Sequence, residues 1–387
     1  MTVPGTTAGA ADGDAEWGDG TRSVHAGYPE PVAGQPFLPG PVFAAPYHLG
    51  SGGPGDVVDG YGRASNPTWR ALESAIAELD GGECVLFPSG MAAIATVLRT
   101  TCRAGDVVVM PADGYFVARQ LFTGELAHLT VRYLPTVGPW TSADVAGARL
   151  VLIETPSNPG MQVCDIAEVA ALCHASGALL AVDNTTATPL GQQPLALGAD
   201  ICLASDTKAL AGHSDLVLGH ISCADPALAE QLRTARAVGG LAPGPFETWL
   251  THRGLGTLDL RLSRQAANAA ALTERLREHP VVSALRWPGL PGDPGHPIAV
   301  RQMRRFGGVF SFELPSARAV DVFLANCVLV AAATSFGGLH STADRRAQWG
   351  DPVPAGLVRF SCGCEDTADL LEDALTALDR VQSSGPA

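Results

Sequence analysis

The chain has 387 residues and almost no lysine. Lys and Arg together number 25, and Lys208 is the single lysine, so the other 24 are arginines. Clusters of basic residues are missing too, and the formal net charge is −14. Because such a charge repels nucleic-acid phosphates and anionic lipid surfaces, we expect neither a nucleic acid nor a membrane as a partner.

Long apolar runs and targeting signals are also missing. No uninterrupted stretch reaches the roughly 18 apolar residues that cross a bilayer. The first residues lack the basic start and apolar segment of a secretory signal. The sequence therefore predicts a cytoplasmic protein.

The nine cysteines form no pattern that indicates disulfides or a metal site. Disulfide frameworks are typical of short secreted chains, whereas these cysteines are scattered and mostly lie in apolar runs. The closest pair, Cys362 and Cys364, lacks the CxxC spacing and neighbouring histidines of a zinc site. We expect reduced core cysteines and no bound metal.

What the chain does contain is enough apolar sequence for a large core. Hydrophobic residues make up 46% and charged residues 17%, which is a folded globular composition. Residues 1–60 are rich in Gly, Pro and Asp without a sustained period, which predicts an extended N-terminal arm. We expect a large domain over residues 61–250 and a smaller C-terminal domain over residues 251–387.

The large domain alternates between helices and nearly all-apolar strands. A first helix is predicted after Asn66, which can cap it, with Pro67 in the first turn. The predicted strands are ECVLF, DVVVM, HLTVRYL, RLVLIET, ALLAVDN and ADICLAS. Such strands separated by helices indicate an α/β fold with a mostly parallel sheet covered on both faces.

The C-terminal region has a different pattern. One long helical pattern covers about residues 247–279, and a helix is predicted near residues 316–326. The strands GGVFSFEL and LVRFSC and a terminal helix over EDTADLLEDALTALDRV complete the order. This order indicates an α+β domain of antiparallel strands with helices on one side.

Lys208 has a chemistry that arginine cannot replace. A neutral lysine amine condenses with an aldehyde, whereas arginine stays protonated. The alternative is a surface lysine in an arginine-rich composition. Its position after the strand ADICLAS, at the sheet edge where α/β proteins bind ligands, favours the chemical role.

Asp183 ends the preceding strand and supplies a second feature. Enzymes that use pyridoxal 5′-phosphate need a Schiff-base lysine and an acid that keeps the ring nitrogen protonated. Asp183 and Lys208 follow successive strands, so both can reach one planar ligand. The phosphate could lie at the helix start after Ser89 and Gly90, near the hydroxyls of Ser205 and Thr207, although a plain helix cap also explains Ser89.

Several motifs resemble one known family. The stretches YGRASNPT, PSGMAA, ETPSNP, VDNTTATP, SDTKALAGHSD and RFSCG occur in the order found in the Cys/Met-metabolism family of pyridoxal phosphate enzymes, over about residues 22–381. This resemblance implies an aminotransferase-like architecture, fold type I. It also implies a homotetramer, a dimer of dimers with shared active sites, and a small amino-acid substrate.

The resemblance also implies roles for single residues. Lys208 would be the Schiff-base lysine, Asp183 the partner of the ring nitrogen, and Tyr115 a catalytic residue stacked on the ring. Further cofactor contacts would come from Ser89, Gly90, Met91, Ser205 and Thr207, and from Tyr61 and Arg63 of a neighbouring subunit. The substrate would be held by Asn158, Ser335 and Arg359.

Some of these residues have structural alternatives. Arg359 could form a surface ion pair, and Tyr115 could be a packed helix residue. His213 and His220 lie near Lys208 in the sequence, but we interpret them as structural, since the displaced lysine can itself act as the base.

The resemblance favours a cystathionine γ-lyase-type elimination that yields cysteine, 2-oxobutanoate and ammonia. The alternatives are a cystathionine γ-synthase-type replacement on an O-acylhomoserine, a methionine γ-lyase and, outside catalysis, a protein that only binds the cofactor. Four residues depart from the family pattern: Thr334 and His340 stand where glutamates are usual, Asp206 replaces a small residue and Thr186 an aromatic one. These departures concern the far end of the substrate.

Overall fold

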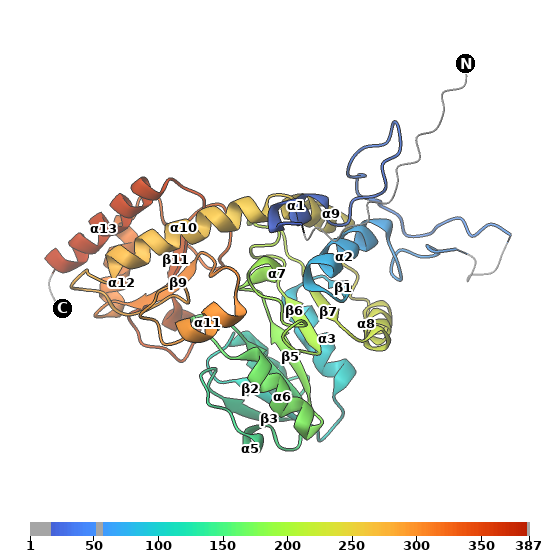
Figure 1. The fold of residues 1–387 in the computed structure, drawn as a ribbon, viewed down its shortest axis with the longest axis horizontal. Coiled ribbons are helices and arrows are strands. Elements are labelled where there is room, and N and C mark those ends of the chain that lie inside the picture. The colour runs from blue at the N-terminus through green and yellow to red at the C-terminus, as the bar shows by residue number, and fades with distance from the viewer. Residues whose placement is uncertain (1–16, 52–56, 385–387) are drawn as a thin grey trace.

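The computed structural model describes residues 17–51 and 57–384 (Figure 1). These residues form a seven-stranded and a five-stranded sheet, each with its own helices. The limits of the two domains remain a prediction from the sequence. Among the described residues, no helix combines the length and apolar character needed to cross a membrane.

The seven-stranded sheet is mostly parallel. Its order is β1-β7-β6-β5-β4-β2-β3, and β7 alone runs antiparallel to both of its neighbours. The strands are β1 (Glu83–Phe87), β2 (Val107–Pro111), β3 (Thr130–Leu134), β4 (Ala148–Glu154), β5 (Leu179–Asp183), β6 (Ile201–Ala204) and β7 (Gly219–Cys223). The sequence did not predict β7, because its residues His220 and Ser222 are polar although the whole strand is buried.

Helices cover both faces of this sheet, as the apolar strands predicted. Alternate strand residues serve the two faces: Val108 and Met110 pack with the helix cluster on one side, and Val109 with that on the other. The first side carries α3 (Gly90–Thr101), α4 (Val117–Thr123) and α8 (Pro226–Gly239). The other carries α2 (Pro67–Asp80) and α6 (Ile166–Ser176), and the short helices α5 (Ser142–Val145) and α7 (Thr188–Gly191) lie in connections.

The five-stranded sheet has the order β10-β11-β12-β9-β8. All its pairs are antiparallel except β10 with β11. Its strands are β8 (Ser283–Arg286), β9 (Val309–Glu313), β10 (Ala331–Ala332), β11 (Thr342–Arg345) and β12 (Leu357–Ser361). Phe310, Phe312 and Phe360 pack against α12 (Ala317–Asn326) and α13 (Thr367–Ser383). Arg359 lies between core residues of β12 and therefore points to the opposite face.

The predicted long helix of residues 247–279 is divided in two. The structure has α9 (Pro245–Leu255) and α10 (Leu258–Leu276), separated at Gly256 and Thr257. The buried guanidinium of Arg261 donates hydrogen bonds to the carbonyl oxygens of Gly254, Ala209 and Leu210. Arg261 therefore joins the helix break to the turn that follows Lys208, a contact between distant residues that local periodicity could not reveal.

The arm is partly helical rather than wholly extended. Its described part contains α1 (Asp19–His25), and the described residues after α1 lie mostly at the right of the molecule in Figure 1. Phe37 is 91% and Phe43 70% exposed in this chain. Pro46 and Tyr61 form an isolated bridge that turns the arm back toward α2.

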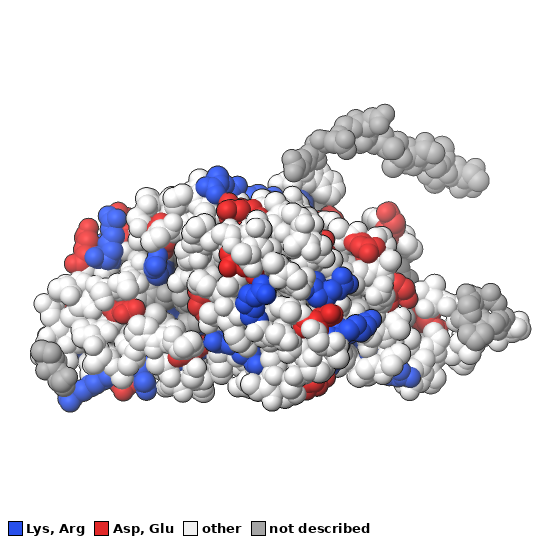
Figure 2. Space-filling model, turned by 90° about the horizontal axis from the view of Figure 1, so that it is seen from below, with Lys and Arg blue, Asp and Glu red and all other residues white. Residues whose placement is uncertain are grey.

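The surface carries charges of both signs. On the face shown in Figure 2, acidic and basic side chains are interspersed. The two remaining short helical segments, α11 (His296–Gln302) and η2 (Arg346–Trp349), lie in the C-terminal part of the chain, and η2 contributes to the site described next.

Candidate active site

A cavity of about 460 Å³ lies at the carboxyl ends of β4, β5 and β6 and reaches the five-stranded sheet. This is the edge where ligands bind in open α/β sheets. Eleven of the residues proposed from the sequence line it: Ser89, Gly90, Met91, Tyr115, Asn158, Asp183, Ser205, Thr207, Lys208, Ser335 and Arg359. Tyr61 and Arg63 lie outside the cavity of their own chain; Tyr61 is half exposed and Arg63 donates to the carbonyl of Ala237.

Lys208 sits in the turn after β6 with its amine inside the cavity. Its Nζ donates to Ser335 Oγ at 2.7 Å and lies 5.3 Å from the centre of the Phe336 ring. Burial, followed by the nearby cations Arg359 and Arg346, lowers the pKa of Lys208 from 10.5 to about 8. About a tenth of the amine is therefore uncharged at pH 7, far more than for an ordinary lysine, and nucleophilic chemistry requires this neutral form.

Two carboxylates end neighbouring strands beside the lysine. Asp183 and Glu154 are paired in register at the ends of β5 and β4. Burial raises the pKa of Asp183, and hydrogen bonds from Thr185 oppose that rise. Burial and the charge of Asp183 raise the pKa of Glu154 well above its usual range. A cation in the cavity would stabilise the charged form of Asp183, which is what a protonated ring nitrogen supplies.

Glu154 was missed by the sequence reasoning. Its Oε2 accepts from the backbone N–H of Tyr115 at 2.6 Å, and its Oε1 accepts from that of Asn158 at 2.9 Å. It therefore fixes the backbone of two proposed site residues. The same signal that indicated Asp183, a carboxylate ending an apolar strand, would have identified it.

The start of α3 forms one end of the cavity. Ser89 caps the helix, its Oγ accepting from the N–H of Ala92 at 3.0 Å, so the capping alternative is correct for this side chain. A Cβ at Gly90 would lie 2.7 Å from the Cβ of Ser205, so only glycine fits there. The Thr207 hydroxyl is bonded to the backbone of Leu218. The helix start and Ser205 thus leave a close-packed backbone surface suited to an anion.

Arg359 is buried at 4% exposure, so it is no surface ion pair. Its Nη1 donates to Asn158 Oδ1 at 2.8 Å and its Nη2 to the Ser335 carbonyl at 3.0 Å. Asp344 lies 3.3 Å from the same Nη2. Burial lowers the pKa of Arg359 to about 10, which leaves it charged at neutral pH.

Ser335 connects the lysine to the arginine. It has a φ of 75°, a left-handed conformation that is costly for a residue other than glycine. In this conformation its hydroxyl accepts from Lys208 and its carbonyl accepts from Arg359. A strained backbone at a site with these two contacts indicates a functional constraint.

Tyr115 and the rim residues complete the cavity. Tyr115 lies just before α4, with burial raising the pKa of its hydroxyl. The sequence did not single out Phe336, Arg346 or Trp349, which also line the cavity. Thr334 lines it as well, whereas His340 is exposed and His213 and His220 lie outside the lining.

Comparison with known proteins identifies the family. The model of the Cys/Met metabolism PLP-dependent enzyme family matches residues 55–379. The chain belongs to this family. It is therefore a pyridoxal-phosphate-dependent enzyme of sulfur amino-acid metabolism, of the carbon–sulfur lyase and synthase class.

The relatives differ in reaction. A Streptomyces coelicolor protein that carries a provisional cystathionine gamma-lyase name is 52% identical, over 94% of each chain. The cystathionine gamma-synthase of Mycobacterium tuberculosis is 40% identical over 93% of this chain and 97% of its own. The cystathionine gamma-lyase of Bacillus subtilis is 38% identical over 83% and 89%.

Solved structures share the fold across the same range of reactions. The cystathionine gamma synthase of Xanthomonas oryzae pv. oryzae, in complex with aminoacrylate and cysteine, has a TM-score of 0.90 at 35% identity and covers 95% of this chain and 100% of its own. A methionine gamma lyase from Micromonospora echinospora has a TM-score of 0.88 at 38% identity, over 94% and 99%. These matches confirm the expected fold type I architecture.

Proposed function

We propose that the enzyme eliminates the γ-substituent of cystathionine and releases cysteine, 2-oxobutanoate and ammonia. The observation that carries this proposal is the pair of contacts at Ser335, which hold a partly neutral amine and a buried guanidinium around one space. An α-amino acid whose carboxylate binds Arg359 would place its α-carbon within reach of Lys208.

The residues present fit pyridoxal 5′-phosphate. We propose that Lys208 binds its aldehyde carbon, Asp183 its ring nitrogen, and Tyr115 one face of the ring. The phosphate would contact the backbone of Gly90 and Met91 and the residues Ser89, Ser205 and Thr207. When bound, this cofactor withdraws electrons from the substrate α-carbon.

Lys208 is the proposed general base. Burial and the nearby cations lower its pKa to about 8, so the amine can take up the α-proton and release it again near neutral pH. Its bond to Ser335 fixes the direction of the amine before the substrate arrives.

Arg359, Asn158 and Ser335 are the proposed substrate-positioning group. The guanidinium offers a planar pair of donors to a carboxylate. Glu154 accepts a hydrogen bond from the backbone N–H of Asn158, and the Asn158 side chain accepts one from Arg359. These contacts order the binding residues before the substrate arrives, so the site is preorganised to orient the substrate.

Tyr115 is the proposed proton donor to the leaving sulfur. Because burial raises the pKa of its hydroxyl, the group keeps its proton at neutral pH. Its backbone bond to Glu154 sets its place at the cavity edge.

A second copy of the chain completes the proposed site. Tyr61 and Arg63 do not line the cavity of their own chain, and in the sequence they lie between the arm and α2. We propose that they contact the phosphate of a neighbouring subunit in a cytoplasmic homotetramer built from paired dimers. Sedimentation measures the oligomeric state under the conditions of the activity assay. A fully active monomer would contradict this arrangement.

A γ-replacement on an O-acylhomoserine is the second candidate. It is supported by the Mycobacterium tuberculosis and Xanthomonas relatives, which carry cystathionine gamma-synthase names. The test supplies the purified enzyme with cystathionine, with methionine, or with an O-acylhomoserine plus cysteine. Release of 2-oxobutanoate and cysteine from cystathionine supports the lyase proposal, whereas net formation of cystathionine overturns it.

A further inference from the structure

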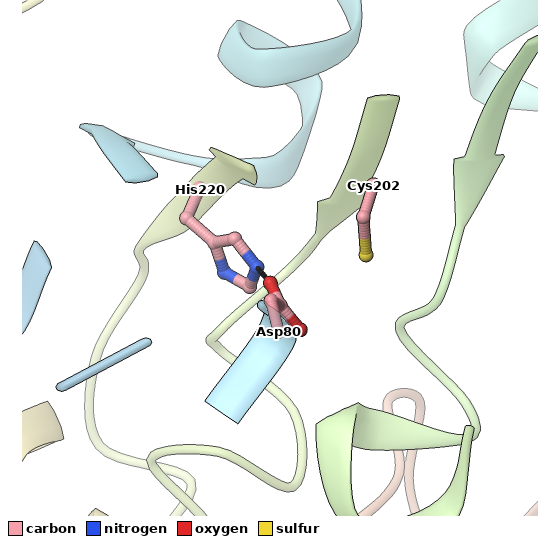
Figure 3. Close-up of side chains that lie close together, drawn as sticks. All are labelled: Asp80, Cys202 and His220. Carbon is pink, nitrogen blue, oxygen red and sulfur yellow. Dashed lines mark hydrogen bonds and ion pairs between the residues drawn. The ribbon is translucent and has the colours of Figure 1, made fainter. Parts of the chain in front are cut away.

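A buried group of three side chains lies behind the lysine turn, on the side away from the cavity. His220 of β7 has its Nδ1 2.6 Å from Asp206 Oδ1 and its Nε2 3.0 Å from Asp80 Oδ2. Each of the three is at most 2% exposed. We call Asp80, His220 and Asp206 the buried clamp; Figure 3 shows His220 and Asp80 with the neighbouring Cys202.

The clamp requires a charged histidine. Both partners are carboxylates, so each ring nitrogen donates and the ring is an imidazolium. Burial alone would lower the pKa of His220, but the charge and hydrogen bond of Asp206 and the hydrogen bond of Asp80 raise it well above its usual range. The clamp therefore holds one cation between two acids in the protein interior.

Asp80 depends on that cation. It is the last residue of α2, where the helix dipole disfavours a negative charge. Its Oδ2 accepts from His220 and, at 2.7 Å, from Ser222 Oγ. These two donors offset the unfavourable position, so β7 is tied firmly to the end of α2.

Asp206 ties the same histidine to the lysine turn. It lies between Ser205 and Thr207, which line the cavity, while its own side chain points into the core. The N–H of Lys208 donates to the Ser205 carbonyl at 3.2 Å, and the N–H of Ala211 to the Asp206 carbonyl at 3.0 Å. Because these backbone bonds hold the turn together, a displacement of Asp206 would also displace Lys208.

We propose that His220 is a positioning residue: held between Asp80 and Asp206, it fixes the turn from Ser205 to Lys208 and so sets the place of the amine and of the phosphate contacts. This inference rests on the function proposed above. It also gives a structural reason for the acidic residue two positions before the lysine. The acid is tolerated because β7 supplies the opposing charge.

A metal site is the competing interpretation of the same side chains. Ligand atoms of Asp80, Cys202 and His220 lie within 4.8 Å of one another. A metal would need a free lone pair on a ring nitrogen, but each nitrogen faces a carboxylate oxygen at hydrogen-bond distance. The geometry suits two protons on the ring better than a metal.

The test compares Asp206→Ala, Asp206→Asn, His220→Gln and the double variant Asp206→Ala/His220→Gln. The dissociation constant of pyridoxal phosphate is measured by titration of the apoprotein. We expect Asp206→Ala and His220→Gln each to raise this constant about tenfold, and the double variant to be no weaker than either alone, because both remove one interaction. Asp206→Asn keeps an oxygen acceptor and should stay within about twofold of the wild type.

Ser222→Ala is the matched control. It removes a buried hydrogen bond to Asp80 from the same strand but leaves the contact to the lysine turn intact. It should lower the melting temperature of the apoprotein and leave cofactor affinity unchanged. If it weakens the cofactor as much as His220→Gln does, the clamp acts only through general stability and the proposal is wrong.

The remaining outcomes are equally decisive. Unchanged cofactor affinity in Asp206→Ala would overturn the proposal even if His220→Gln fails to fold. A dissociation constant of the double variant that equals the product of the two single effects would overturn it as well. Stoichiometric metal in the wild type that is lost in His220→Gln would establish the metal interpretation instead. A wild type that binds no cofactor would overturn the proposed function itself. If the wild type binds the cofactor and the variants bind it equally well, only the positioning role of His220 is overturned.

Discussion

The two ends of the cavity are built differently. At the cofactor end, Glu154 and Asp183 end neighbouring strands of one sheet, and Lys208 follows the next strand. Glu154 is buried, Asp183 and Lys208 are partly buried, and all three are held by backbone or side-chain contacts. At the outer rim, Thr334 lies just after the short strand β10 and Trp349 ends η2, and both are exposed. We therefore expect the sheet edge to fix the chemistry and the rim to set the selectivity, which agrees with relatives of one family that differ in reaction.

The largest effect should come from changing the amine itself. Lys208→Arg keeps a positive charge but removes the nucleophile and the base, so we expect turnover to fall by at least about 10³-fold. The measurement is 2-oxo acid release, with the melting temperature of the variant as a folding control. Turnover near the wild-type rate would show that the cofactor end lies elsewhere.

Asp183→Asn should be nearly as severe. The amide cannot stabilise a protonated ring nitrogen, so we expect kcat to fall by about 10²- to 10³-fold and cofactor affinity to weaken. Asp369→Asn, a change at an exposed acid of α13, serves as the matched control. Equal kcat values for both variants would show that Asp183 does not have the proposed role.

The pKa of the Lys208 amine can be measured by chemical labelling, because the chain has no other lysine that would react with an amine reagent. Labelling of the apoprotein, followed by peptide mass spectrometry, should rise with pH through a midpoint of about 8. At pH 8 the neutral fraction is about a hundredfold above that of an ordinary lysine. Unfolding in urea should move the midpoint toward 10.5.

The same shift predicts the sign of a stability change. Because the folded pKa of about 8 lies below the ordinary 10.5, the unfolded chain binds more protons between these values. This group therefore makes the apoprotein more stable as pH rises through that window. A labelling midpoint that is the same in folded and unfolded protein would contradict both expectations.

Arg359→Lys should have an intermediate effect. The loss of planar donors to the substrate carboxylate costs about 1.5–3 kcal/mol, which corresponds to a rise in KM of about 10- to 100-fold. Arg318→Lys, at an exposed residue of α12, is the control. A change in kcat alone would indicate that Arg359 acts on the reaction rather than on binding.

The smallest effect is expected at the rim. Thr334→Glu places a carboxylate on an exposed residue, where an ion pair with the distal ammonium of cystathionine is worth about 0.2–1 kcal/mol, a few-fold decrease in KM. Thr334→Gln adds the same length without charge and should leave KM unchanged. Equal responses to both variants would show that charge at the rim does not select the substrate.

The sequence predicted the features that depend on local pattern. Alternating apolar strands and helices indicated the large sheet, and residues at the strand ends indicated Lys208 and Asp183. Strand β7 was missed because the partners that neutralise His220 lie on α2 and in the lysine turn, far from it in the sequence. Arg346 and Asp344 were missed because β11 and η2 are too short to show a period. The roles of Tyr61 and Arg63 remain predictions that involve a second chain.

The contacts of Arg261 constrain how the two sheets can move. Helix α10 packs with the five-stranded sheet, yet near its first turn it is bonded to the carbonyls just past Lys208. A rotation of that sheet about the break at Gly256 would displace the segment that carries Lys208. Opening the cavity to admit substrate must therefore either pivot somewhere else or carry the reactive amine along with it, which couples entry of a ligand to the readiness of the site.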